Sequence, residues 1–494
     1  MSNLAVLPII IPLIAGIVVA LFNAKVAISR TLTKILSIIS LGVVSYISWI
    51  VFTEGSIILE TGGWVAPYGI VLVADPLATI LVLTTNIVAV ACAFYAPHSL
   101  TLKQEQHYFY AFYFFLISGV SGAFLTGDLF NLFVFFEVLL MASYALIVLG
   151  GDKIQLRESI KYVLINLFSS ILFVTAVAFI YGTVGTVNMA QIAERVQEME
   201  QGGILTTIAI LLFFVFATKA ALFPLYYWMP KSYIVPNAVV SALFAALLTK
   251  VGIYSILRVF SLIFVHQIDI THQMFIWIAG LSMLFGVIGA LSTNNIKLII
   301  AYNIIPAIGF IIMGIGVFNQ DALSGSIYYL IHDMIIKTAL FLIVSAIAYV
   351  AGTSDLRKMG GLIHYYPGLG WLLFISAIIL AGIPPFSGFI GKLLLIKGAV
   401  SNDEITIVII TLLTSLLILY SVMKIFIRGF WGEKDESGKY DNKKPINGLI
   451  APIIFLLAFS VLLGVGAELI YPSIDSISAY LLDPQLYIDS VLKE

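Results

Sequence analysis

Long apolar segments, separated by short polar loops, run from one end of this chain to the other. A helix of about 20 apolar residues crosses the hydrocarbon core of a bilayer, and only helices or closed barrels satisfy their backbone hydrogen bonds there. The pattern therefore predicts an all-α polytopic membrane protein with about 14 transmembrane helices. The predicted spans are 4–23, 32–53, 75–96, 107–126, 128–149, 160–182, 203–223, 238–260, 273–292, 297–318, 323–350, 371–398, 405–430 and 448–470.

The loops between these spans alternate in charge. Loops 24–34, 150–161, 351–370 and 428–447 are net positive, whereas loops 54–75, 183–202 and 401–404 and the tail after Glu468 are net negative. Basic loops stay in the cytoplasm, so both termini are predicted outside, in agreement with an even number of spans. The polar segment GTVNMAQIAERVQEMEQGG is interpreted as a solvated connector, with a short amphipathic surface helix as the alternative.

Composition agrees with a membrane protein and excludes several other classes. The chain has 494 residues and a net charge of -1, and 61% of its residues are hydrophobic. Only 10% are charged, against about 25% in a typical soluble chain. The single cysteine, Cys92, excludes cysteine-ligated iron–sulfur clusters and internal disulfides, and there is no Rossmann fingerprint, P-loop or HExxH motif. No cofactor is therefore expected. We also expect a transport subunit and not an enzyme, and no nucleic-acid partner.

Charged side chains lie in the middle of several predicted spans. A charge at bilayer depth costs from about 2.5 to more than 10 kcal/mol unless it is paired or hydrated. Several such charges in separate spans predict a polar path for ions or protons inside the membrane. The charged residues are Glu137, Lys219, Lys250, Lys337 and Lys392.

His332 precedes Lys337 in the same predicted span. Five residues correspond to about 140° around a helix, so the two side chains point in different directions unless the helix unwinds. An unperturbed histidine titrates near neutral pH, which suits a proton relay. A histidine that only satisfies helix packing is the alternative.

Two of the charged spans are interrupted by proline. Pro224 follows Lys219 in the seventh span, and Pro384 and Pro385 precede Lys392 in the twelfth. A proline inside a helix removes a backbone hydrogen bond, and transporters use such broken helices to build sites at the midplane of the membrane. A tolerated kink is the alternative for either proline taken alone.

The two broken spans lie five spans apart, which predicts an internal repeat. Residues 107–260 (spans 4–8) and 273–430 (spans 9–13) would each cross the membrane an odd number of times, so the two copies would be inverted. Residues 1–106 would form three N-terminal helices. Residues 431–494 would form a charged cytoplasmic loop, helix 14 and an outside tail.

The segments around these charges resemble one protein family. They are GDLFNLFVFFEVL, ATKAALFPLYYWMP, PNAVVSALFAALLTKVGIYSILR, NNIKLIIAYNIIPAIGF, YYLIHDMIIKTALFLIVSAIAYVAGTSDLRKMGGL and GIPPFSGFIGKLLLIKGA. Together they resemble the antiporter-like subunits of Mrp-type Na+/H+ antiporters, respiratory complex I and membrane-bound hydrogenases. The length, and SGFIGKLLL around Lys392, are most similar to the D-type subunits of the Mrp antiporters. Lys231 and Ser232, where many relatives have an acidic residue or a histidine, and Asp333, where some have a second histidine, depart from the family pattern.

The resemblance implies a proton-translocating subunit of a multisubunit Na+/H+ antiporter in a prokaryotic cell membrane, with other subunits and the lipid bilayer as partners. It implies that Glu137 and Lys219 form an ion pair, although a purely structural salt bridge is the alternative. Lys250, His332 and Lys337 would continue the path, and Lys392 would be its terminal relay. Because these groups are rich in lysine and a sodium site needs oxygen ligands, Na+ binding is assigned to the assembled complex.

Two other functions remain open from the sequence. The chain could be a proton-pumping subunit of a complex I-like or hydrogenase redox complex, or a membrane scaffold whose charges are vestigial. Snorkelling at the span ends is the predicted explanation for the remaining charges. They are Asp75, Asp128, Arg258 and Lys297, with Lys424 predicted at the interface.

Overall fold

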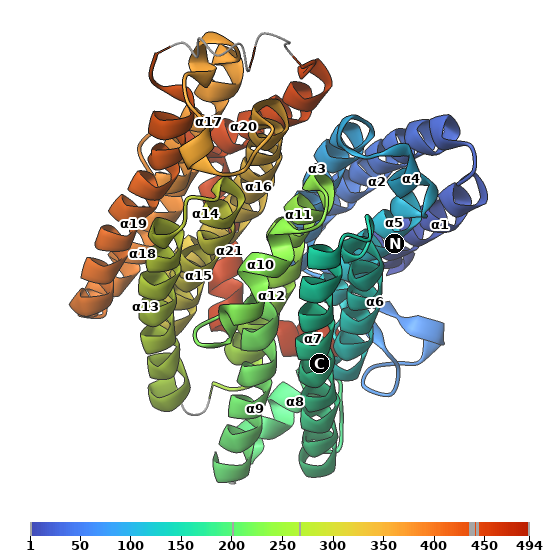
Figure 1. The fold of residues 1–494 in the computed structure, drawn as a ribbon. Helices are drawn as coiled ribbons and strands as arrows, with labels where there is room; N and C mark the ends of the chain where they lie inside the picture. The colour runs from blue at the N-terminus through green and yellow to red at the C-terminus, as the bar shows by residue number, and fades with distance from the viewer. Residues whose placement is uncertain (1, 200–201, 266–267, 434–439, 441–443, 493–494) are drawn as a thin grey trace.

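The protein is a bundle of long helices (Figure 1), here described from a computed structural model that covers residues 2–199, 202–265, 268–433, 440 and 444–492. Most of the charged loop predicted near 432–444 lies outside these residues. The helices are α1 (Leu7–Leu21), α2 (Val26–Glu54), α3 (Pro76–Ser99), α4 (Leu102–Gln106), α5 (Phe109–Leu125), α6 (Leu129–Ile147), α7 (Lys153–Val184), α8 (Met189–Glu198), α9 (Gly202–Ala220), α10 (Met229–Ile234), α11 (Ala238–Leu243), α12 (Thr249–Leu262), α13 (Ile268–Ser292), α14 (Ile296–Tyr302), α15 (Ile304–Val317), α16 (Gln320–Ala351), α17 (Pro367–Ala381), α18 (Ser387–Ser401), α19 (Ile405–Ile425), α20 (Asn447–Val465), α21 (Ala467–Leu482) and α22 (Pro484–Leu492).

The predicted fold class is confirmed. Within the described residues, 12 helical stretches are long and apolar enough to cross a membrane, and Phe109–Leu125 and Pro367–Ala381 are shorter apolar helices. Each predicted span coincides with one of these stretches, or with the pair α17 and α18. The chain is a polytopic all-α membrane protein.

The two spans that were predicted to be broken, at Pro224 and at Pro384 and Pro385, are interrupted there. α9 ends directly after Lys219, at Ala220, and the helical stretch resumes beyond Pro224 and ends at Ile234. The twelfth span is divided into α17 and α18, and Gly382, just after α17, adopts a left-handed backbone conformation with a φ of 82°. The breaks leave the last carbonyls of the preceding helix without helical partners, which allows side chains to bind them.

The eighth span is not the regular helix that the sequence predicted. α11 and α12 are joined by a π-helical turn at Phe244–Leu248, and Lys250 lies just after it. A π turn shifts hydrogen bonds to carbonyls five residues back, and such turns are frequent at functional sites. The apolar pattern of this span gave no sign of the turn.

α16 lies at the centre of the bundle (Figure 1). It contacts α11 on one side and α18 on the other, and also α15, α20 and α21. Nearly all of its residues are buried. Polar residues on α16 can therefore reach both predicted repeats.

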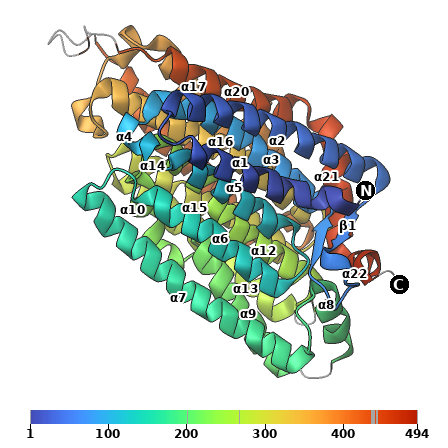
Figure 2. The ribbon, with the colours of Figure 1, turned by 90° about the vertical axis from the view of Figure 1, so that its right-hand side faces the viewer.

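Segments of the predicted outside loops 54–75 and 183–202 and of the C-terminal tail gather at one end of the bundle, together with both termini (Figure 2). We call this the outer end, after the predicted orientation. It carries the antiparallel strands β1 (Ile57–Glu60) and β2 (Val71–Ala74), and α8, α21 and α22. The connector predicted around α8 is wrong: Met189, Ile192 and Val196 form a buried helical stripe, and α8 packs against α22. An apolar face at helical spacing favours packing over a solvated loop.

The snorkelling explanation is wrong for Asp75 and Arg258. Their side chains form an ion pair with a distance of 2.5 Å and are 0% and 4% exposed. Tyr487 of α22 lies with its ring centre 5.0 Å from the guanidinium of Arg258, so the C-terminal tail covers the pair. Asp128 also has a local role, because its carboxylate accepts a hydrogen bond from the backbone N–H of Asn131 and caps α6.

Candidate ion pathway

One carboxylate and two ammonium groups meet in the centre of the protein. Asp333 on α16 lies 2.7 Å from the Nζ of Lys250 on α12 and 3.7 Å from the Nζ of Lys337, one turn further along α16. All three side chains are 0% exposed. We call these three residues the central ion cluster. Because α12 and α16 belong to different predicted repeats, the cluster joins the two halves.

Each lysine of the cluster also binds a backbone carbonyl. Lys250 donates to Ala245 O in the π turn at 2.6 Å, and Lys337 donates to Asn303 O, between α14 and α15, at 2.8 Å. The π turn therefore supplies a hydrogen-bond acceptor that a regular α-helix would use internally. Neither oxygen of Asp333 has a partner in good hydrogen-bond geometry, so Asp333 holds the lysines by charge and can still accept a hydrogen bond.

The charges of the central ion cluster do not balance when all three groups are ionised. Two ammonium groups and one carboxylate leave one excess positive charge on side chains that are 0% exposed, which is costly. Loss of one proton from either lysine leaves a neutral cluster that contains one ion pair. The balance of charge in the cluster therefore changes with the gain or loss of a single proton.

The predicted ion pair between Glu137 and Lys219 is open in this structure. Lys219 donates to Asn166 O and to Ser170 Oγ on α7, each at 3.2 Å, and its Nζ lies 5.8 Å from the ring centre of Phe136. Glu137 is half-buried, and among the described residues it forms no ion pair within 4.0 Å. Its Oε1 is buried without a hydrogen-bond partner. The two acceptors on α7 replace the carboxylate as partners of the Lys219 ammonium.

Lys392 lies at the break of the twelfth span. Its ammonium donates to Leu380 O at 3.2 Å and to Ala381 O at 2.9 Å, the last carbonyls of α17. A cation at the C-terminal end of a helix is favourable because that end carries partial negative charge. A Cβ at Gly382 would lie 2.9 Å from Cδ of Lys392, so a glycine at this position both forms the turn and leaves room for the lysine.

His332 and Lys337 point in different directions, as their spacing predicted. α16 is continuous from Gln320 to Ala351. His332 Nδ1 lies 2.8 Å from Ser387 Oγ on α18, and its Nε2 is buried without a partner. The ring of Tyr329 lies near both His332 and Lys392. Its centre is 5.1 Å from the centre of the His332 ring and 5.8 Å from the Nζ of Lys392.

The structure thus brings Lys250 and Lys337 together around Asp333, whereas Glu137 and Lys219 form no ion pair with each other and His332 and Lys392 each lie beside Tyr329. Asp333 was not among the predicted site residues, although it lies four residues before Lys337, a spacing that places opposite charges on one helix face. Asn303 and Ser170 gave no such signal. Within the described part of the chain, no group of three His, Cys, Asp or Glu side chains could hold a metal ion.

Comparisons with known proteins support the resemblance drawn from the motifs. The model of the family described as "NADH:quinone oxidoreductase/Mrp antiporter, TM" matches residues 126–418. The chain is 50% identical, over the full length of both proteins, to the D-type Na(+)/H(+) antiporter subunit of Bacillus subtilis (strain 168).

Two solved structures also share the fold. A chain in the structure of the Mrp complex from Dietzia sp. DQ12-45-1b is 28% identical and superposes with a TM-score of 0.91 over 99% of each chain. A chain of the membrane-bound sulfane sulfur reductase, an archaeal respiratory membrane complex, is 25% identical, with a TM-score of 0.90 over 100% of each chain. The protein therefore belongs to the NADH:quinone oxidoreductase/Mrp antiporter transmembrane family.

Proposed function

We propose that this chain is the proton-translocating subunit of a multisubunit Na+/H+ antiporter. Protons move between Glu137, Lys219, the central ion cluster, and His332 with Lys392. The observation that carries the proposal is the central ion cluster: two lysines share one carboxylate, and all three side chains are 0% exposed. A cluster with one excess proton is suited to pass protons on.

Asp333 is the switching group in this mechanism. Its carboxylate lies between two ammonium groups, and an opposite charge favours the protonated form of a lysine. When Asp333 is closer to Lys250, as it is here, Lys337 is the lysine that more readily gives up its proton. If the carboxylate moves toward Lys337, Lys250 becomes the lysine that more readily gives up its proton. A small displacement of Asp333 therefore moves the site of proton release from one lysine to the other.

The buried charges favour transport over a scaffold role. Buried charges cost free energy, whereas apolar residues of similar volume pack as well or better, so a scaffold gains no stability from them. The identities favour an antiporter over a redox pump, because the relative named as an antiporter subunit is 50% identical and the chain from a respiratory complex is 25% identical. The chain is accordingly proposed to be a transport subunit and not an enzyme.

The proposed partners are the other subunits of the antiporter, which supply the Na+ site. We expect the purified chain in liposomes to exchange no measurable Na+ for H+, whereas the complete complex does. Robust exchange by the chain alone would show that the site is self-contained, and would contradict the assignment of Na+ to the assembly.

Two features of the organisation stay proposals. The repeats are residues 107–260 and 273–430 in inverted orientation, and each contains one broken helix with a lysine next to the break. Both termini lie at the same end of the bundle (Figure 2), and the loop charges favour the outside of a prokaryotic cell membrane for that end.

The substitution Lys337→Met tests the function with little disturbance of the fold. It removes the excess positive charge and leaves Lys250 paired with Asp333 at 2.7 Å, so we expect the complex to assemble. Na+-dependent dissipation of ΔpH in everted vesicles should nevertheless be abolished.

Lys424→Met is the matched control. Lys424 is likewise a lysine bound to backbone carbonyls, those of Leu291 and Thr293, but it is only half-buried and lies outside the proposed path. Wild-type antiport in the Lys337→Met variant, at matched amounts of complex, would refute the proposed function.

A further inference from the structure

The seam between α16 and the C-terminal helices α20 and α21 contains polar contacts at three successive levels. At the outer level, Ser324 Oγ lies 2.6 Å from Ser478 Oγ on α21. One turn further in, the hydroxyl of Tyr328 donates to Leu463 O on α20. Another turn further in, Ser387 Oγ lies 2.8 Å from both His332 Nδ1 and Ser460 Oγ.

These levels follow a single face of α16. Residues 324, 328 and 332 are spaced by four, so their side chains lie one above the other on the helix. The distance from the first to the last is about 12 Å along the axis. A line of hydroxyl groups thus joins the outer end of α16 to a titratable histidine in the middle of the bundle.

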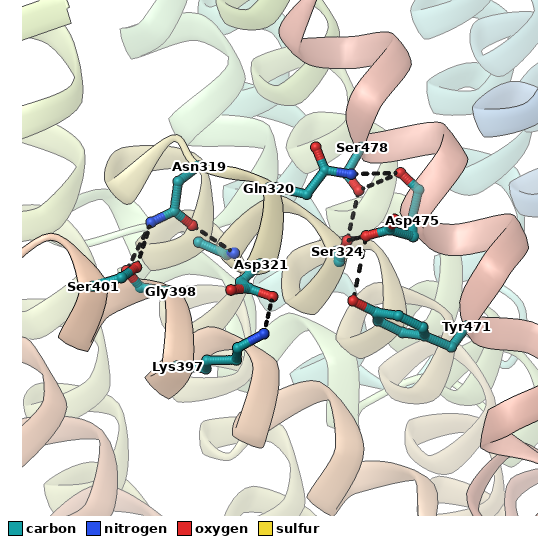
Figure 3. Close-up of polar contacts among 11 residues, drawn as sticks. Asn319, Gln320, Asp321, Ser324, Lys397, Gly398, Ser401, Tyr471, Asp475 and Ser478 are labelled. Carbon is teal, nitrogen blue, oxygen red and sulfur yellow. Dashed lines mark hydrogen bonds and ion pairs between the residues drawn. The ribbon is translucent and has the colours of Figure 1, made fainter.

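Acidic groups surround the outer start of this line (Figure 3). Asp321 is paired with Lys397 at 2.8 Å, and their side chains are 23% and 64% exposed. Asp475 accepts hydrogen bonds from Tyr471 at 3.3 Å and from Ser324 at 3.5 Å. Within the described residues Asp475 forms no ion pair, so this opening is net negative and reaches solvent.

We propose that this seam is the water-accessible route by which protons pass between the outer end and His332. The proposal rests on the function proposed above and adds the access route to it. We call the seam the outer route; it runs from Asp475 through the Ser324–Ser478 contact, Tyr328 and the Ser387–Ser460 contact to His332.

The chemistry of the outer route suits proton passage. A hydroxyl group both donates and accepts, so a proton that arrives on its lone pair is balanced by release of the hydroxyl proton on the other side. The gaps between levels are about one helical turn, a distance that a single bridging water spans. At the inner end, Nε2 of His332 is fully buried without a partner and is free to take part in the next transfer. The net negative opening raises the local concentration of cations, protons included.

The competing explanation is that these hydroxyl groups only pack between helices, with no water among them. Ser326 is a matched control for Ser324 in a test of the two explanations. Ser326 lies on the same helix, is equally buried, and donates to Ile311 O on α15, away from the seam. A water-filled route predicts that Ser324 and Ser326 differ in accessibility. Packing alone predicts that both are closed.

Cysteine accessibility separates the two explanations. The natural chain has one cysteine, so Cys92→Ala gives a background for the single variants Ser324→Cys, Ser460→Cys, Ser478→Cys and Ser326→Cys. Open membrane fragments that contain the whole complex are treated with a small charged methanethiosulfonate, so that either face is reached. We expect the three route variants to react at least about tenfold faster than Ser326→Cys, because a thiol reacts as the hydrated thiolate. Equal rates would overturn the proposal.

Antiport provides the second readout. Asp475→Asn removes the unpaired charge at the outer opening, and we expect the rate to fall several-fold. Glu468→Gln, on the exposed face of the same helix, should have no effect, and the same rates in both variants would contradict a role of Asp475 in the route.

The two proposals fail in different ways. If Lys337→Met leaves antiport intact, the proposed function is wrong, whatever the labelling shows. If Lys337→Met abolishes antiport but the cysteine variants all react equally, only the outer route is wrong.

Discussion

The open pair of Glu137 and Lys219 and the central ion cluster use the same types of side chain in different states. In the central ion cluster, Asp333 contacts two lysines and every side chain is fully buried. In the first half, Glu137 is half-buried with an unpartnered oxygen, and Lys219 binds Asn166 and Ser170 in its place.

The difference follows the depth of burial. A fully buried carboxylate needs a cation, because the desolvation penalty is otherwise uncompensated. A carboxylate that reaches the surface of the chain is partly solvated or covered by a partner, and tolerates separation from its lysine. Glu137 and Lys219 can therefore come together without breaking an ion pair. In the central ion cluster, Asp333 can approach Lys337 only by moving away from Lys250.

The largest expected effect is that of Asp333→Ala. It leaves two lysines fully buried without a counter-charge, and removal of one partner from a buried pair typically costs about 3–5 kcal/mol. We expect the amount of folded complex in membranes to fall more than tenfold, as measured by immunoblot of the membrane fraction. Asp355→Asn is the control: its side chain is 25% exposed and pairs with the exposed Arg357, and a surface ion pair contributes little, so the amount should stay unchanged. Normal assembly of Asp333→Ala would mean that the central ion cluster is not held by its carboxylate.

Glu137→Ala and Lys219→Ala should separate assembly from transport. Since the two side chains are not in contact, neither substitution breaks an ion pair, and we expect the complex to assemble. Antiport should still be abolished in both, because in the proposed path the pair must close to move the proton. Everted vesicles measure the Na+-dependent dissipation of ΔpH. Activity like that of the wild type in either variant would remove the pair from the proposed path.

Lys392 binds two backbone carbonyls and, among the described residues, no carboxylate. Variants of Lys392 test whether antiport requires this residue to lose its proton. Arginine stays protonated, whereas lysine can lose its proton when desolvated. Lys392→Arg is therefore expected to impair antiport nearly as much as Lys392→Ala, and Lys392→Glu should retain more activity than either. Full activity of the arginine variant would show that Lys392 supplies only a fixed charge next to the end of α17.

The smallest expected effect is that of Ser170→Ala. It removes one of the two acceptors of Lys219, and a single hydrogen bond contributes about 1 kcal/mol, or about fivefold in an equilibrium. We expect the antiport rate to change by less than that factor. Ser169→Ala, which removes a hydrogen bond to Val215 O on α9, should leave the rate unchanged. A complete loss of antiport in Ser170→Ala would show that the open position of Lys219 is itself required.

The apolar pattern was sufficient for the fold class, for the positions of the spans and for both breaks. Burial in lipid demands long apolar helices, and a proline removes a backbone hydrogen bond at its own position, so both signals are local in the sequence. Proline alone was not sufficient for a break, because α1 and α20 continue through Pro12 and Pro452. The charges at Lys219, Lys250, Lys337 and Lys392 stood out for the same reason. The prediction for α8 was wrong because its apolar stripe is buried by α22, and the sequence does not show that these two distant segments pack together.

Contacts between distant segments were decided by the tertiary structure alone. Sequence spacing does not reveal that Asp333 meets Lys250 between the two predicted repeats, that Asp75 meets Arg258 under the C-terminal tail, or that Lys219 binds α7 and not Glu137. Each of these depends on how helices far apart in the chain are packed, and on which carbonyls a π turn or a broken helix leaves available. The sequence by itself therefore determined which residues are charged inside the membrane, and the packing of the helices decided which of those charges meet, because an ion pair is set by distances of a few ångströms that no local pattern encodes.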